Sequence, residues 1–137
     1  MKNFSGKALR WQWHGGIVEV ILDREPANEI GTVLLGELEE FVRAMKSFES
    51  DTAACIISSA KKRGFSAGAD LRELYHGAIA LPEKERNARV RDFVERSHAV
   101  ANAIDAAPFV TIAATGALNQ QRCVQAAFVV YVCGAGG

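Results

Sequence analysis

Small residues between positions 64 and 71 form the part of this sequence best suited to hold a polarised or negatively charged oxygen. The segment reads Gly64-Phe65-Ser66-Ala67-Gly68-Ala69-Asp70-Leu71. Small side chains let a ligand approach the main chain closely. If the segment opens a helix, its N–H groups point outward, and helix N-termini favour negative charge. Such donors stabilise a thioester oxygen that becomes an enolate in a transition state.

A purely structural alternative fits the same residues. The segment would then be a tight turn between a strand and a helix, with Asp70 as the N-cap or as a first-turn acid. Both interpretations stay open on physical grounds alone. The binding interpretation requires that main-chain N–H groups around position 67 are free and convergent in the folded chain.

A β-hairpin is expected upstream of this loop. Residues 9–13 alternate between apolar and polar side chains, which is typical of a half-buried strand. Gly15 and Gly16 follow, and paired glycines form two-residue hairpin turns because both tolerate positive φ. Residues 17–22 are rich in β-branched side chains and are predicted to form the return strand.

Helices and strands alternate through the rest of the sequence. After Thr32 the apolar residues recur at three- and four-residue spacings, as on one face of a helix. Short uncharged runs are typical of strands that are covered on both faces. The expected order begins with a helix over 32–45, a strand over 53–57 and a short helix from the loop to about Tyr75. A longer helix from about Pro82 to before Pro108 and a buried strand over 109–114 follow. The buried stripe of the longer helix is expected to include Val90. Such alternation implies crossover connections and an α/β architecture.

Three segments resemble motifs of the enoyl-CoA hydratase/isomerase (crotonase) family. Residues 65–71 resemble the motif Phe-x-Ala-Gly-Ala-Asp-Leu. Residues 22–28 resemble the first CoA-contacting segment, Leu-x-Arg-Pro-x-x-Asn, with the proline one place later, and residues 107–114 resemble the strand Lys-Pro-x-Ile-Ala-Ala. The resemblance covers about residues 8 to 116, the N-terminal half of the family's domain. It implies an α/β crotonase-like (ClpP/crotonase) fold of stacked ββα units, incomplete at the C-terminal end.

The resemblance also implies a site. The Ala67 N–H would be one of two oxyanion-hole donors to a thioester carbonyl, and Arg24 would approach a CoA phosphate. The residues that would border the acyl-CoA are Arg24, Ala27, Ser66, Ala67, Gly68, Ala69, Asp70 and Leu71. Lys61, Lys62 and Arg63 are weaker phosphate candidates, with a solvated turn as the alternative. Coenzyme A enters as part of the substrate, and no metal or redox cofactor is implied.

The sequence departs from the family pattern after residue 116. The family continues with an Asn-Gly turn, a glycine run that supplies the second oxyanion donor, and a catalytic Glu-Leu. Here Thr115-Gly116 fits the turn, but an ungapped alignment puts residues 120–122, Gln-Gln-Arg, at the glycine run and Val124 at the glutamate. Valine can neither position nor deprotonate water, and loss of a general acid–base group typically costs ~10²- to 10⁴-fold in rate. Whether this chain is an enzyme is therefore left open.

Two interpretations account for this departure. In the first, the chain is a truncated or altered member of the family, with an N-terminal part over 1–116 and a divergent tail over 117–137. In the second, it is a short relative that binds acyl-CoA or a partner without catalysis. The parent reaction is hydration or isomerisation of a 2-enoyl-CoA in acyl-CoA metabolism.

Composition limits which partners and which cellular location are expected for this chain. Sixteen basic and sixteen acidic residues cancel, so no global field attracts nucleic acid or an anionic membrane. The N-terminus lacks the apolar region of a signal peptide, which favours a cytoplasmic protein. Half of a domain would expose apolar surface, so a homo-oligomer or a completing partner chain is expected.

Overall fold

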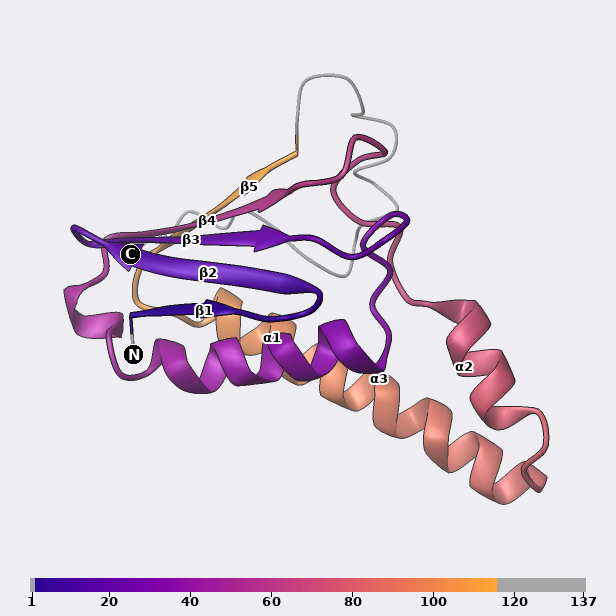
Figure 1. Ribbon diagram of the computed structural model, residues 1–137. Helices are drawn as coiled ribbons and strands as arrows, with labels where there is room; N and C mark the ends of the chain where they lie inside the picture. The colour runs from indigo at the N-terminus through magenta and orange to yellow at the C-terminus, as the bar shows by residue number, and fades with distance from the viewer. Residues whose placement is uncertain (1, 116–137) are drawn as a thin grey trace.

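The computed structural model describes residues 2–115, which form a five-stranded sheet with helices on one face (Figure 1). The strands are β1 (Asn3–Ser5), β2 (Leu9–His14), β3 (Ile17–Leu22), β4 (Ala54–Ser59) and β5 (Val110–Ala114). The helices are α1 (Thr32–Met45), α2 (Leu71–Ala78) and α3 (Glu83–Asp105), and a short 3-10 turn, η1, spans Glu49–Asp51. The predicted order of elements is confirmed, and β1 and η1 are additions.

The order of strands in the sheet follows their order in the sequence. β1, β2 and β3 are antiparallel neighbours, whereas β3, β4 and β5 run parallel. Gly15 and Gly16 close the β2–β3 hairpin with φ values of 57° and 84°, a conformation that glycine adopts without steric cost. α1 connects β3 to β4, and α2 and α3 connect β4 to β5. The carboxyl ends of the three parallel strands therefore lie along the same side of the sheet. We call this side, where the strands end, the carboxyl edge.

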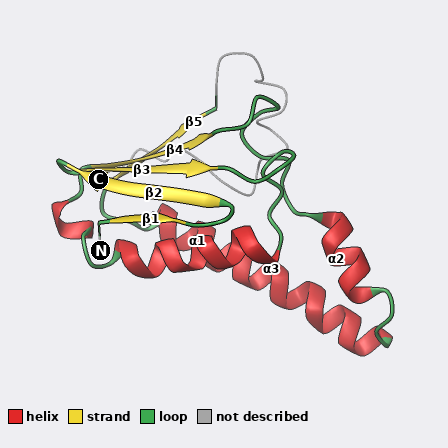
Figure 2. Cartoon of the chain, viewed as in Figure 1, coloured by secondary structure: helices red, strands yellow, loops and turns green. Residues whose placement is uncertain are grey.

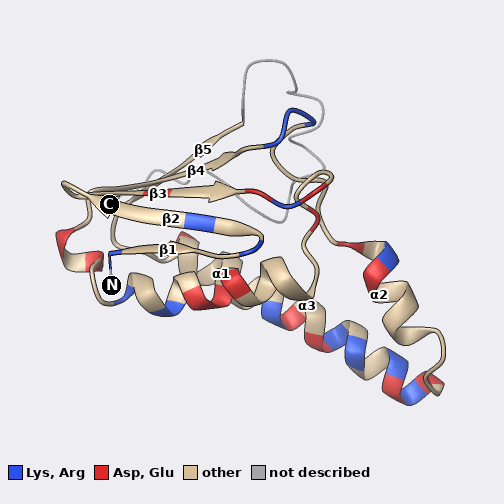
Figure 3. Ribbon diagram, viewed as in Figure 1, with Lys and Arg blue, Asp and Glu red and all other residues tan. Residues whose placement is uncertain are grey.

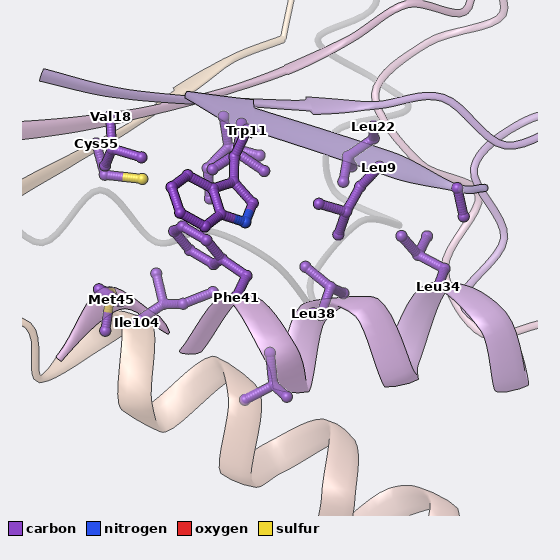
Figure 4. Packing of buried hydrophobic residues seen from close by; sticks show 14 of the residues in the cluster. Leu9, Trp11, Val18, Leu22, Leu34, Leu38, Phe41, Met45, Cys55 and Ile104 are labelled. Carbon is purple, nitrogen blue, oxygen red and sulfur yellow. The ribbon is translucent and has the colours of Figure 1, made fainter. Parts of the chain in front are cut away.

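The core lies between the sheet and α1. Figure 4 shows side chains from alternate strand positions facing side chains from α1. Trp11 packs edge-on against Phe41, with ring centroids 5.9 Å apart, and also contacts Phe48. Ile104 of α3 joins the cluster from below. This continuous core supports the strands from which the loops at the carboxyl edge emerge.

α2 and the first half of α3 project beyond the sheet (Figure 2). Val90 is 37% exposed, so its predicted place in a buried stripe is wrong. The reason is that α3 outruns the core, and its projecting half carries charges of both signs (Figure 3). Val110 and Ile112 of β5 are also exposed, so this strand is covered on only one face among the described residues.

A bidentate ion pair ties α3 to α1. Arg96 donates from Nε and Nη2 to the two carboxylate oxygens of Glu39, at 2.7 and 2.8 Å. These hydrogen bonds hold the pKa of Glu39 below its usual value, although partial burial opposes the shift. The pair is therefore intact above the pKa of an unfolded Glu and is lost as the pH falls through the lowered pKa of the folded state.

We expect Glu39→Gln to lower the free energy of unfolding by about 1 kcal/mol at pH 7. Because protonation removes the same interaction, the difference from the wild type should shrink as the pH is lowered from 5 to 3. Urea unfolding across this pH range measures both effects. The matched control is Glu40→Gln, since the Glu40–Arg43 pair is largely exposed. Equal losses for the two variants would show that the α1–α3 pair has no particular role.

Candidate functional site

Two loops meet at the carboxyl edge of the parallel strands. Residues 23–31 follow β3 and residues 60–70 follow β4, and the two segments are joined by a parallel bridge between Ile30 and Ala69. Crevices outside the carboxyl ends of parallel strands are the usual ligand sites of α/β sheets. The residues that the sequence singled out on both loops are therefore brought together.

Main-chain hydrogen bonds join the two loops. The Ala67 N–H donates to the Ala27 carbonyl at 2.9 Å. The Ile30 N–H donates to the Gly68 carbonyl at 2.8 Å, and the Asp70 N–H donates back to the Ile30 carbonyl at 2.9 Å. Residues 27–30 thus support residues 67–70 along their length.

This pairing overturns one sequence-based prediction. The Ala67 N–H was expected to be free for a thioester carbonyl, and that is wrong because Ala27 accepts its hydrogen bond. The Gly68 N–H is also engaged, since it donates to Ser66 Oγ at 3.1 Å. The binding interpretation as predicted from the sequence, with the Ala67 N–H as the donor, therefore fails.

The N–H of Ala69 differs from its neighbours. No hydrogen bond engages it within residues 2–115. The C=O of a trans peptide and the N–H that follows it point in opposite directions, and the Gly68 carbonyl points at Ile30. The Ala69 N–H therefore points away from the supporting loop. Gly68 makes this geometry accessible with φ of 86°, a region that side chains rarely occupy.

Asn28 is the matched asparagine of the segment over residues 22–28, but no role at the site was predicted for it. It is fully buried and has φ of 53°. Its Oδ1 accepts from the Arg24 N–H at 2.7 Å, and its Nδ2 donates to Ser59 Oγ at 2.8 Å and to the Phe65 carbonyl at 2.9 Å. One amide side chain thus ties both loops to the end of β4. Its position in a polar turn was the available signal, because Asn tolerates positive φ and bonds nearby main chain.

Arg24 is partly buried between the two loops. Its Nη2 donates to Asp70 Oδ2 at 2.7 Å and lies 3.4 Å from Glu73 Oε2, and its Nη1 donates to the Glu29 carbonyl. The predicted contact between Arg24 and a CoA phosphate stays a prediction. In this structure both terminal nitrogens already have protein partners.

Asp70 and Glu73 complete the polar cluster. Asp70 is the N-cap of α2, and its Oδ1 accepts from the Glu73 N–H at 2.9 Å. That main-chain donor, followed by Arg24, holds the pKa of Asp70 below its usual value. Glu73 in turn accepts from the Thr32 N–H at 2.8 Å and so caps α1. The structural alternative for Asp70 is therefore confirmed. It coexists with an Ala69 N–H that has no partner within the described residues.

The basic residues of the turn after β4 differ in their surroundings: one forms ion pairs and two are exposed. Lys61 lies 2.8 Å from Asp23 Oδ1 and also contacts Glu25, so it fastens this turn to the loop after β3. Lys62 and Arg63 are exposed. Leu71, at the start of α2, is 71% exposed. It leaves an apolar side chain two residues from the Ala69 N–H.

Two other kinds of site are absent from residues 2–115. No helix in this part of the chain has the length and apolar character needed to cross a membrane. It also contains no group of three or more His, Cys, Asp or Glu side chains placed to hold a metal ion.

Solved structures share this arrangement. An enoyl-CoA hydratase from Bacillus anthracis matches with a TM-score of 0.64 at 26% identity, over 80% of this chain. Pseudomonas aeruginosa DspI matches with a TM-score of 0.64 at 26% identity, over 82% of the chain. An enoyl-CoA hydratase from Geobacillus kaustophilus matches with a TM-score of 0.63 at 23% identity, over 81%. The chain has a crotonase fold.

The crotonase fold confirms the predicted fold class and the resemblance to the enoyl-CoA hydratase/isomerase family. This chain spans only about two-fifths of those proteins, 40% of the B. anthracis enzyme and of DspI and 39% of the G. kaustophilus enzyme. No protein-family model and no curated protein sequence matches it. The residues aligned with the glycine run and the catalytic glutamate, and the proposed tail over 117–137, lie outside the described residues.

Proposed function

We propose that this chain binds acyl-CoA thioesters at the loop over residues 66–71, with the Ala69 N–H donating to the thioester carbonyl oxygen. The observation that carries the proposal is the direction of this N–H. It points away from the loop that supports it and has no partner among the described residues. The likeness to enoyl-CoA hydratase structures supports the choice of ligand.

The proposed donor is suited to its task by its surroundings. Ala69 precedes the N-cap of α2, where the helix dipole favours negative charge. The peptide groups on both sides of Ala69 are held by Ile30, so the donor is oriented before a ligand arrives. Preorganised donors stabilise a developing oxyanion without rearrangement at the moment of reaction. The exposed Leu71 side chain offers an apolar contact beside the carbonyl position.

Binding is proposed without hydration. Addition of water to a 2-enoyl thioester requires a base for the water and an acid for the adjacent carbon. The position that aligns with the family's glutamate is Val124 in this sequence. Among the described acids at the loop, Asp70 and Glu73 are occupied by Arg24 and by helix N-termini. We therefore expect this chain to retain the oxyanion donor and to lack the proton-transfer groups.

Isothermal titration with two ligands tests the proposal. Acetyl-CoA carries the thioester carbonyl, whereas S-ethyl-CoA, a thioether, replaces that carbonyl by CH₂. One added hydrogen bond predicts that acetyl-CoA binds roughly 2- to 10-fold more tightly. Absence of heat with both ligands, or equal affinities, contradicts the proposal. Turnover of crotonyl-CoA by this chain would refute the claim that proton-transfer groups are missing.

A further inference from the structure

A chain of hydrogen bonds connects the Arg24 guanidinium to the Ala69 N–H. Arg24 Nη1 donates to the Glu29 carbonyl. The Ile30 N–H, on the other side of that same peptide group, donates to the Gly68 carbonyl at 2.8 Å. The Ala69 N–H lies on the other side of the Gly68 carbonyl's peptide group. We call this series, Arg24 with the peptide groups 29–30 and 68–69, the peptide relay.

We propose that Arg24 is a positioning residue that strengthens the Ala69 N–H as a donor by acting through the peptide relay. This inference rests on the proposed function, because it assigns a cause to the strength of the proposed donor. A cation at one end of a hydrogen-bonded chain polarises each peptide group in turn. Such cooperativity strengthens a hydrogen bond by perhaps 10–30% per link.

The geometry favours transmission along this path. Both peptide groups are trans, so each carbonyl and the following N–H point in opposite directions and their dipoles align. The Arg24 side chain is only 24% exposed, which limits screening by water. The guanidinium is also fixed, because Asp70 and Glu73 hold its other terminal nitrogen.

The carboxylates of Asp70 and Glu73 limit how much Arg24 can change the affinity for a carbonyl ligand. Asp70 and Glu73 are negative and oppose the long-range field of Arg24 near the loop. They are bound to Nη2, whereas the relay begins at Nη1. The expected effect is therefore the short-range one carried by the hydrogen bonds, and it amounts to a roughly 2- to 5-fold change in affinity for a carbonyl ligand.

Arg24→Gln tests the relay because glutamine removes the charge and keeps an N–H donor. We expect the preference for acetyl-CoA over S-ethyl-CoA to fall roughly 2- to 5-fold, since a contact between Arg24 and a CoA phosphate would affect both ligands alike. The infrared C=O stretch of bound acetyl-CoA should also shift back toward its frequency in solution. A merely structural role for Arg24 would weaken both ligands together. Arg10→Gln is the matched control, since Arg10 pairs with Asp23 and stands outside the relay.

A second measurement uses the wild-type chain, because Arg24 also supports the loop. In two-dimensional ¹H–¹⁵N NMR spectra, acetyl-CoA should move the Ile30 amide proton downfield together with that of Ala69, whereas S-ethyl-CoA should leave Ile30 in place. A static Ile30 signal, or an unchanged carbonyl frequency in Arg24→Gln, overturns the relay. If the wild type binds neither ligand, the proposed function itself fails, so the two failures are distinguishable.

Discussion

Replacing Asn28 by alanine is expected to lower the free energy of unfolding by about 3–5 kcal/mol. The substitution removes one acceptor and two donor hydrogen bonds at a fully buried position. Each buried polar group left without a partner costs about 1–3 kcal/mol. Alanine also disfavours the observed φ of 53° by roughly 1–2 kcal/mol. Because a domain of this size is stable by only about 5–15 kcal/mol, much of the stability would be lost.

Urea unfolding of three variants separates the cost of the lost hydrogen bonds from the cost of the positive φ. Asn28→Gly permits the positive φ, so it should be more stable than Asn28→Ala by about 1 kcal/mol and still far less stable than the wild type. Asn102→Ala is the matched control, because Asn102 is exposed on α3 and its replacement should stay within about 0.5 kcal/mol of the wild type. An Asn28→Ala midpoint equal to that of Asn102→Ala would show that this amide does not hold the loops together.

Much of the fold follows from local patterns in the sequence. The β2–β3 hairpin is marked by alternation and by the Gly15-Gly16 turn, and α1 by its apolar spacing, and both lie where these patterns predict. β1 was missed because its three residues carry no periodic signal, and it exists through pairing with β2. Val90 was misplaced because apolar spacing shows which face of α3 could be buried, but not where the core ends.

The sequence indicated which loops carry the candidate site, but not how those loops are hydrogen-bonded. The loop over 66–71 and its neighbour over 23–31 were found from residue types and family resemblance. Which N–H is free depends on the pairing of Ile30 with Ala69, a contact between residues far apart in the sequence. No composition or spacing encodes that register. Sequence reasoning therefore chose Ala67, two residues from Ala69, whose N–H has no partner among residues 2–115.

The register also explains how one loop can contribute to stability and still leave an N–H group for the proposed binding. Along residues 67–70, the N–H groups of Ala67 and Asp70 face the supporting loop, whereas that of Ala69 faces away. Opposite directions of successive peptide groups allow this division. Asp70 can cap α2 and pair with Arg24 without occupying the proposed donor. A structural turn and an oxyanion-binding loop are thus compatible descriptions of the same residues.

Gly68→Val is expected to weaken acetyl-CoA binding by more than about 10-fold. The reason is that the variant would lose both the orientation of the donor N–H and the ligand's access to it. Gly68 is buried and has φ of 86°, a conformation that a β-branched side chain almost never adopts. Valine would rotate the peptide groups around position 68. Because the Gly68 carbonyl and the Ala69 N–H belong to one peptide group, this rotation breaks the bond from Ile30 and redirects the proposed donor.

Gly64→Val provides the matched control for backbone strain. Gly64 also has a positive φ, 129°, and a Cβ there meets no atom within 4 Å. Both variants should lose stability in urea, but only Gly68→Val should lose the preference for acetyl-CoA over S-ethyl-CoA. The comparison isolates the peptide group that bears the donor, since the two strained positions lie four residues apart on one loop. Equal binding by Gly68→Val and the wild type would remove residues 66–71 from the ligand site.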